Sequence, residues 1–351
     1  MARLMSAVAA VAPVSLAMLV LWGIGSVAQT STVKVASAAI ASDVGFFLAQ
    51  KKGYFRQEGL NVEFTQLANA PQMIGPLGRG QLDVGAGTVS AGLYNAVERD
   101  IALRAVADKG SMRPGYGFSG LMVRKDLVDS GRFKTFRDLK GMKIAVGTFA
   151  SANSSAVNEA LKRGGLTWAD ANMVELQFPQ HLPAYANKAI DASMTNEPTS
   201  TQAVQNRLAV RVAGNDEIYP DQQTAVVLYS ELFMRQRPQV ALKFMRAYIR
   251  AVRDYNDALA DGRLAGPNAD EVVSLLTEFT FIKDAKVHRE ITPAAIDPDG
   301  KLNLKGLRND LAFFKELKLL QDPNMTVERI VDTSIAEQAA KELGPYRARR
   351  N

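Results

Sequence analysis

The side chains that could do chemistry in this chain are hydroxyl, amide and carboxylate groups gathered in four short segments. The segments are 37–43, 87–90, 148–155 and 195–198, and each lies between an apolar run and a helix-like pattern. Such side chains hydrogen-bond small ligands, and the first turn of a helix offers free backbone N–H groups to an anion. The sequence therefore predicts polar ligand contacts at Ser42, Asp43, Thr88, Ser90, Ser151, Asn153, Ser154, Asn196 and Glu197.

Each of these segments also has an ordinary structural interpretation. Ser, Thr and Asp cap helix N-termini, so Asp43 is as well suited to capping the helix that follows it as to contacting a ligand. Pro198 at a helix start makes Asn196 and Glu197 common residues for that position. The segment 148–155 favours ligand binding most, because five of its eight residues carry hydrogen-bonding side chains, which is more than capping requires.

Three aromatic residues are candidates for a wall against which a flat ligand could stack. Phe149 lies in the third segment, whereas Tyr116 and Phe118 lie in the glycine-rich stretch 110–120, where hinge packing is the alternative role. None of the four segments contains Arg or Lys. The acidic candidates favour amino or ring N–H groups and the helix starts favour an anion, so the ligand's charge stays open. We expect a small organic molecule, aromatic or heterocyclic, rather than an inorganic anion.

The elements that position these segments form a pattern that occurs twice. Strand-like runs alternate with helical patterns, which predicts parallel sheets covered by helices. The stretch "QLDVGAGTVSAGLYNAVERDIALRAVAD" aligns with "KAIDASMTNEPTSTQAVQNRLAVRVAG" when Asp83 is set against Asp191. Parallel sheets bind ligands outside the carboxyl ends of their strands, so two lobes would share one cleft. Crossings between the lobes are expected at 110–120 and near 224–229, and together they would form a hinge.

These boundaries define the expected domains. Residues 29–115 and 225–351 form one discontinuous lobe, and residues 116–224 form the other. Residues 1–28 contain Arg3, a long apolar run and a final Ser-Val-Ala, which favours a cleaved secretory signal peptide over a membrane anchor. We therefore expect a periplasmic protein.

The composition excludes several other functions. The 351 residues include no Cys and two His, with a net charge of +6. Without Cys there is no disulfide, thiol chemistry or lipid attachment after the signal. The basic residues are scattered, which argues against nucleic-acid binding, and no histidine spacing suggests a metal or cofactor site. His181 is expected in a polar surface loop, and 297–300 in a turn rather than a calcium site. We expect a monomer.

Four segments carry a family resemblance: "DVGFFLAQKKGYFRQEGLNVEF" (43–64), "GRGQLDVGAGTVSAGLYNA" (78–96), "FRDLKGMKIAVGT" (136–148) and "KAIDASMTNEP" (188–198). In these segments the chain resembles solute-binding proteins of the nitrate/sulfonate/taurine and thiamine-precursor type. The resemblance implies an α/β, type II periplasmic-binding-protein fold. It also implies delivery of a small-molecule ligand to an ABC transporter permease with a cytoplasmic ATPase.

The resemblance also suggests two other functions and one departure. Some proteins of this fold are enzymes that make the thiamine pyrimidine or cleave carbon–sulfur bonds, but both depend on cysteine, and this chain has none. A sensor that presents its ligand to a membrane receptor would use the same clamp. In relatives an aromatic residue often precedes the Glu-Pro pair, whereas Asn196 stands here, which removes a stacking wall at that position.

Overall fold

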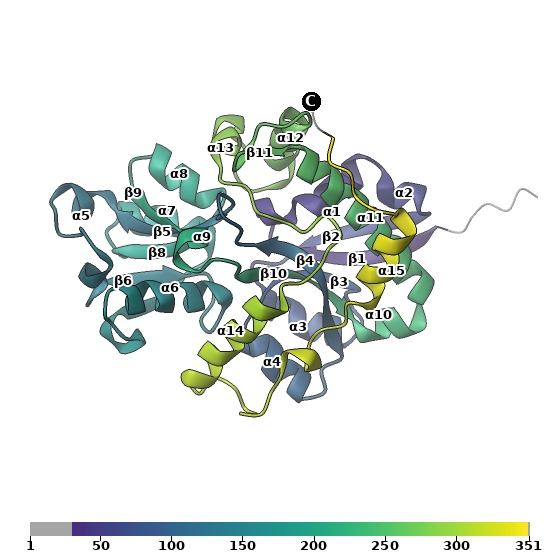
Figure 1. The fold of residues 1–351 in the computed structure, drawn as a ribbon, viewed down its shortest axis with the longest axis horizontal. Helices are drawn as coiled ribbons and strands as arrows, with labels where there is room; N and C mark the ends of the chain where they lie inside the picture. The colour runs from purple at the N-terminus through teal and green to yellow at the C-terminus, as the bar shows by residue number, and fades with distance from the viewer. Residues whose placement is uncertain (1–29, 350–351) are drawn as a thin grey trace, which may run out of the picture.

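The computed structural model describes residues 30–349. The expected signal peptide at 1–28 lies outside these described residues. Within 30–349, no helix is both long enough and apolar enough to cross a bilayer. The chain forms two sheets, each with helices on its faces, and Figure 1 shows them side by side.

The first sheet lies in the lobe that contains both ends of the described chain. Its order is β2-β1-β3-β10-β4, with β1 (Ser31–Ser37), β2 (Leu60–Gln66), β3 (Val84–Thr88), β4 (Leu103–Ser111) and β10 (Gln223–Ser230). Its α-helices are α1 (Val44–Lys51), α2 (Tyr54–Gln57), α3 (Ala70–Gly78), α4 (Ala91–Glu98), α10 (Glu231–Gln236), α11 (Pro238–Asp257), α12 (Ala269–Phe279), α13 (Ala285–Glu290), α14 (Leu304–Glu316) and α15 (Ser334–Leu343). A short hairpin, β11 (Leu259–Ala260) with β12 (Arg263–Leu264), and the 3-10 turns η1 (Ala41–Asp43) and η4 (Val327–Arg329) complete it.

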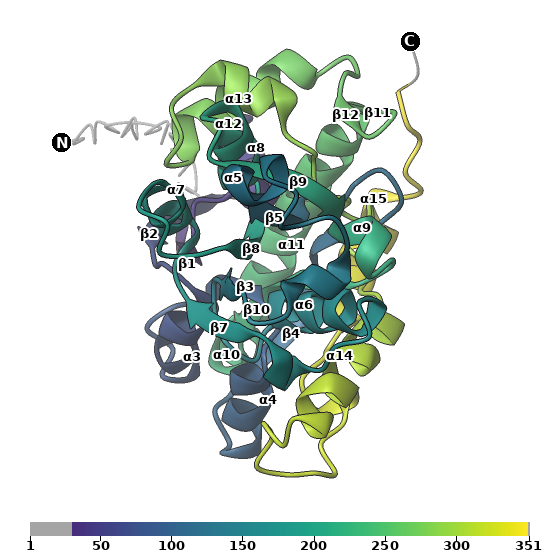
Figure 2. The same ribbon diagram turned by 90° about the vertical axis from the view of Figure 1, so that its left-hand side faces the viewer.

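The strands of the second sheet are arranged in the same way as those of the first sheet. Its order is β7-β6-β8-β5-β9, with β5 (Ser119–Arg124), β6 (Lys143–Val146), β7 (Asn172–Glu175), β8 (Ala192–Asn196) and β9 (Ala209–Gly214). Its helices are α5 (Lys125–Asp129), α6 (Ala152–Arg163), α7 (Phe178–Ala186), α8 (Thr199–Gln205) and α9 (Asn215–Ile218), with η2 (Phe136–Leu139) and η3 (Trp168–Asp170). Figure 2 shows this lobe in front of the first.

The chain passes between the two sheets twice. Residues 112–118 join β4 to β5, and residues 215–222 join β9 to β10. The second crossing therefore precedes the expected segment 224–229, which is part of β10. Each sheet contains one strand, β10 or β5, that runs antiparallel to its neighbours, so the sheets are mixed rather than purely parallel.

The direction of these two strands follows from the crossings. The parallel strands of each lobe end at the edge that faces the other lobe. A chain that arrives from the other lobe enters at that same edge and must run away from it. The strand after each crossing is therefore antiparallel, which the helix–strand alternation in the sequence does not reveal.

The repeat seen in the sequence is also a repeat in structure. The Asp83 carboxylate accepts a hydrogen bond from the Lys34 amide at 2.9 Å, and the Asp83 amide donates to the Lys34 carbonyl at 2.9 Å. Asp191 makes the same two bonds with Lys143, at 3.0 and 2.9 Å. Each aspartate thus fixes the start of its strand against the neighbouring parallel strand, which is β1 for Asp83 and β6 for Asp191.

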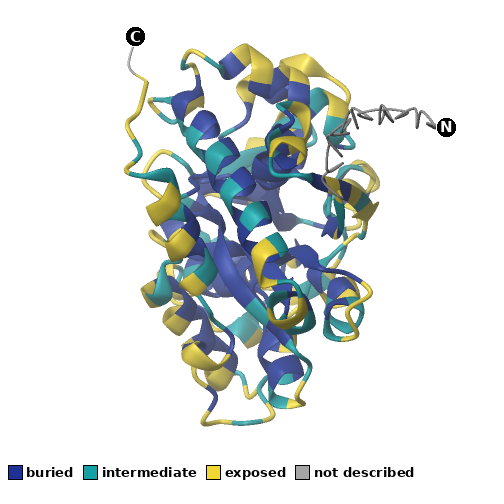
Figure 3. Cartoon of the chain, turned by 90° about the vertical axis from the view of Figure 1, so that its right-hand side faces the viewer, coloured by how far each residue is buried: buried dark blue, intermediate teal, exposed yellow. Residues whose placement is uncertain are grey.

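Helices cover both faces of the first sheet and enclose two apolar cores. One core contains the aromatic residues Phe46, Phe244 and Tyr248 of α1 and α11, and all three are fully buried. Phe244 and Tyr248 are four residues apart, so both lie on the face of α11 that packs against Phe46 of α1. Figure 3 shows buried strands inside and exposed residues on the outer helix faces. Burial of such side chains is the main stabilising contribution.

We predict that replacing Asp83 or Asp191 with Ala lowers the free energy of unfolding by about 1–3 kcal/mol, because a strand amide loses its acceptor. Urea denaturation measures this, with Glu63→Ala, an exposed change on β2, as the control. A loss at one aspartate without a loss at the other would contradict the structural equivalence of the two positions.

Candidate functional site

The four predicted segments meet between the two lobes, at the carboxyl ends of the parallel strands. A cavity of about 30 Å³ lies there and is lined by residues of both lobes. Its polar lining consists of Asn69, Thr88, Lys109, Thr148, Ser151, Asn153 and Gln177. A larger hollow of about 870 Å³ lies beside the end of α6, but only one lobe lines it. The small interlobe cavity is therefore the candidate site.

The lobes touch directly beside this cavity. Ser90 and Ser151 form an isolated antiparallel β-bridge across the cleft. The Ala91 amide donates to the Ala150 carbonyl at 2.8 Å, and the Ala152 amide donates to the Val89 carbonyl at 2.9 Å. The two loops that follow β3 and β6 thus hold the lobes in a closed arrangement.

A buried ion pair forms part of the cavity wall. Lys109, near the end of β4, is 1% exposed, and its Nζ lies 2.5 Å from Asp43 Oδ1 and 2.9 Å from Ser42 Oγ. A buried lysine is stable only when its charge is compensated. The ammonium group has three hydrogens, and these two contacts use two of them, which leaves one donor for the cavity.

The structure places Asp43 and Ser42 behind Lys109 rather than in the cavity lining. The second Asp43 oxygen accepts from Ser37 Oγ at 2.7 Å and from the Ile40 amide at 3.3 Å. The Asp43 side chain makes no capping bond to α1. The structure thus excludes the capping role and shows that Asp43 holds Lys109 and the loop before η1.

Among the other predicted positions, Thr88, Ser151 and Asn153 line the cavity. Asn153 Nδ2 donates to Ser119 Oγ and to Asn196 Oδ1, both at 3.0 Å, so Asn196 orients Asn153. The remaining polar candidates lie outside the lining and bond nearby backbone.

These bonds explain the positions outside the lining. Ser90 caps α4 by accepting from the Leu93 amide at 3.3 Å, and Ser154 Oγ donates to the Thr148 carbonyl at 3.2 Å. Glu197 pairs with Arg211 at 3.1 Å and accepts from the Thr201 amide at 3.0 Å. Its carboxylate also accepts from the Thr292 amide of the other lobe at 3.3 Å, so Glu197 joins the two lobes.

None of the three predicted aromatic residues lines the cavity. Phe149 is 44% exposed, Phe118 at the end of the first crossing is fully buried against Gly110, and Tyr116 lies half-buried within that crossing. Phe118 therefore has the alternative role, which is packing at the hinge. The aromatic residue in the lining is Phe178, the first residue of α7.

The sequence reasoning missed Lys109, Phe178, Asn69 and Gln177. Lys109 lies in an otherwise buried strand, and a buried lysine needs a partner for its charge. A lysine in an apolar strand was therefore the sequence signal for a buried ion pair. Phe178 begins α7, and Pro179 at the second position of that helix is the helix-start signal that the sequence offered.

His181 is not in a surface loop, as its flanking prolines had suggested. It lies fully buried within α7, with Nδ1 2.7 Å from Thr195 Oγ1 and Nε2 3.0 Å from the Leu176 carbonyl. Burial lowers the pKa of His181 to about 4, so the ring is neutral at neutral pH. The loop assignment was wrong because α7 starts before both the residue and Pro183.

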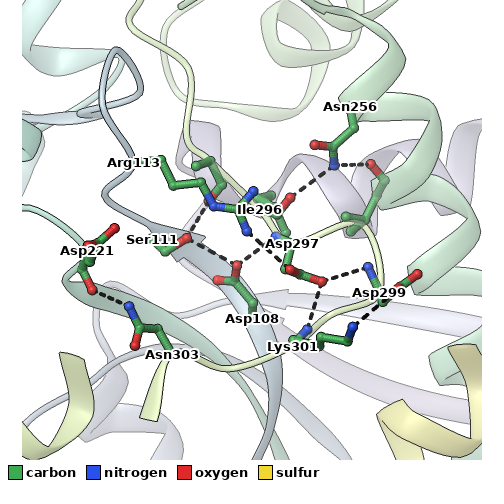
Figure 4. A network of polar contacts seen from close by, with 12 residues as sticks. Asp108, Ser111, Arg113, Asp221, Asn256, Ile296, Asp297, Asp299, Lys301 and Asn303 are labelled. Carbon is green, nitrogen blue, oxygen red and sulfur yellow. Dashed lines mark hydrogen bonds and ion pairs between the residues drawn. The ribbon is translucent and has the colours of Figure 1, made fainter. Parts of the chain in front are cut away.

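A hydrogen-bond network anchors the first crossing to the first lobe (Figure 4). The buried Asp108 carboxylate accepts from the Gly110 amide at 2.8 Å and the Asp297 amide at 2.7 Å. Arg113 bonds Asp297 at 3.2 Å rather than reaching into the cavity. The segment that begins at Asp297 forms the expected turn, closed by a bond from the Gly300 amide at 2.8 Å.

Fold and site together define a two-lobed α/β protein with a cavity at the carboxyl ends of both sheets. Residues 41–259 match the family described as NMT1/THI5 like, a span of more than half of the sequence. The chain belongs to this family.

Two solved structures share the fold. The ligand-binding component of an ABC-type import system from Staphylococcus aureus superposes with a TM-score of 0.71 and 15% identity, covering 89% of this chain and 99% of that one. The periplasmic nitrate-binding protein of Synechocystis PCC 6803 gives 0.72 and 14%, covering 90% and 89%.

Two relatives in sequence differ in their functions. A protein of Brachyspira hyodysenteriae, named as an ABC transporter periplasmic binding protein, is 25% identical over 338 residues, which cover 90% of this chain and 92% of that protein. The 4-amino-5-hydroxymethyl-2-methylpyrimidine phosphate synthase of Aspergillus parasiticus is 29% identical over 226 residues, covering 60% and 61%.

We predict that the double variant Ser90→Cys/Ser151→Cys forms a disulfide that locks the lobes together. In a pair flanked by hydrogen bonds, as this one is, the Cα atoms lie about 4.5 Å apart, within the range a disulfide spans. The natural chain has no Cys, so no other disulfide can form. Thiol titration after mild oxidation measures the result. Ser90→Cys/Ser130→Cys is the control, and free thiols in both variants would contradict the bridge.

Proposed function

We propose that the protein is the extracytoplasmic solute-binding subunit of an ABC-type uptake system. The observation that carries this proposal is a cavity lined from both lobes at the carboxyl ends of their strands. The binding-protein roles named for the relative from Brachyspira hyodysenteriae and the structure from Staphylococcus aureus support it. The ligand is captured between the lobes and delivered to a membrane permease with a cytoplasmic ATPase.

Capture works by rotation of two rigid bodies about the two crossings. Residues 30–111 and 223–349 move as one body and residues 119–214 as the other, with 112–118 and 215–222 as the linking segments. The crossings contain few residues and lie side by side, since the Gly115 amide in the first donates to Asp216 in the second at 2.8 Å. This arrangement suits a hinge, which concentrates backbone rotation in short linking segments.

The ligand we propose carries an anionic oxygen group that binds Lys109. The cavity presents the Lys109 ammonium, hydroxyl groups and side-chain amides, together with the first turns of α3 and α6. No Asp or Glu is among the described residues that line it. Donors without a facing carboxylate favour an oxyanion such as a carboxylate or sulfonate. The Synechocystis PCC 6803 protein that shares this fold is named as a nitrate-binding protein, and nitrate is an oxyanion. Phe178 supplies an apolar wall for the rest of the molecule.

The protein acts as a periplasmic monomer after removal of its signal peptide and does not catalyse a reaction. The chain has no Cys, and its two His are both buried, at hydrogen-bonded positions outside the cavity lining. Nucleophilic and acid–base roles at the cavity would therefore lack the side chains that most often perform them.

We predict that a thermal-shift panel of carboxylates, sulfonates, nitrate and neutral pyrimidines gives positive shifts with an anionic class only. A ligand at about 100 times its Kd stabilises by about 2.7 kcal/mol, which a melting curve resolves. A shift with neutral pyrimidines alone would contradict the anionic class while leaving the binding role intact.

The paired variant Asp43→Asn/Lys109→Met removes both buried charges together and should abolish that shift. Its matched control is Lys52→Met/Asp254→Asn, which removes an ion pair of 2.9 Å in the first lobe outside the cavity lining. The control should keep the ligand shift despite any loss of stability. An unchanged shift in the first variant would remove Lys109 from the site.

A further inference from the structure

A second contact between the lobes lies apart from the cavity lining, where α14 of the first lobe packs against α6 of the second. Trp168 and Phe313 meet edge to face with ring centres 5.6 Å apart, and Lys162 pairs with Glu316 at 3.3 Å. We call this contact the α14–α6 seam. Between these two helices and the second crossing lies the fully buried carboxyl group of Asp310.

Asp310 is joined to the hinge and to the cavity by one side chain. Gln222, in the second crossing, donates through Nε2 to Asp310 Oδ1 at 2.8 Å and to the Ala152 carbonyl at 2.8 Å. Gln222 Oε1 accepts from Asn215 Nδ2 at 2.8 Å. Ala152 begins α6, whose first turn contributes Asn153 to the cavity. Gln222 therefore connects the Asp310 carboxyl group to the second crossing and to the helix that forms part of the cavity wall.

The surroundings of Asp310 do not suit a negative charge. Among the described residues, Asp310 Oδ2 has no hydrogen-bond partner, and no Lys or Arg is among the main influences on the pKa of Asp310. Burial raises the pKa of Asp310 to about 7, although the side chains of Gln222, Ser155 and Tyr219 oppose that shift. A neutral carboxylic acid is the form that such a site favours.

The titratable groups that face Asp310 do not supply a positive charge. Glu159 of α6 raises the pKa of Asp310 further. Tyr94 of α4 and Tyr219 after α9 have pKa values raised by burial, so both stay neutral. At the edges of the seam, Lys162 is held by Glu159 and Glu316, and Arg308 of α14 pairs with Glu328 at 2.7 Å.

We propose that Asp310 is a proton-linked latch, so that closure of the two lobes takes up one proton at the α14–α6 seam. The inference rests on the proposed closure about the hinge. Opening separates α6 from α14 and returns Asp310 to water, where its pKa is about 3.9. Between that value and the value in the closed form, closing consumes a proton, so rising pH opposes closure. Above the closed-form value, closure buries a charge at every pH and the dependence levels off.

The experiment measures lobe closure directly as a function of pH. Because the natural chain has no Cys, Asn61→Cys in the first lobe and Lys140→Cys in the second accept one dye each, and energy transfer reports their separation. The ratio of closed to open protein should fall by up to about tenfold per pH unit from pH 5 to 7, and little beyond. Asp310→Asn mimics the neutral acid and should make the ratio independent of pH. The control is Glu316→Gln, which removes a carboxylate of α14 that also contacts α6, and this variant should keep the pH dependence of the ratio.

Two outcomes would overturn the latch. One is a pH dependence in Asp310→Asn that equals that of the natural sequence, and the other is a constant ratio in the natural sequence across this range. The thermal-shift panel decides the binding role separately, because it compares ligands at one pH with Asp310 unchanged. The latch can therefore fail while the proposed function stands.

Discussion

The double passage of the chain between its two sheets is the constraint on which the rest of the structure depends. Two linking segments allow the lobes to rotate but keep them facing each other. The same passage makes β5 and β10 antiparallel and brings the carboxyl ends of the other strands to a common cleft. Loops that are far apart in sequence thereby become the two halves of one site.

Charge compensation decides what this site can recognise. Asp43 is bonded to Lys109, Ser37 and the Ile40 amide and lies outside the cavity lining, so it does not face the ligand. Lys109 keeps a donor toward the cavity while its charge is balanced from behind. Under the proposed function, an ion pair of this kind keeps the lysine buried while its remaining N–H group hydrogen-bonds an oxyanion.

Much of the fold was predictable from sequence, because apolar periodicity and the Asp83–Asp191 repeat are local signals that survive folding. The site was predictable only in part. The four segments do converge, but whether a side chain faces the cavity depends on partners far away in sequence. Asp43 pairs with Lys109, which is 66 residues later in the chain. Phe178 lines the cavity because α7 starts before Pro183. Strand direction escaped prediction because it depends on where the chain crosses.

The central claim is that two lobes close over a ligand, and small-angle X-ray scattering tests it most directly. The radius of gyration would be measured on the protein alone and with a saturating ligand identified by melting shift. The account predicts a smaller radius with the ligand present. An equal radius, in protein that mass spectrometry shows to be free of co-purified ligand, would contradict closure about the two crossings.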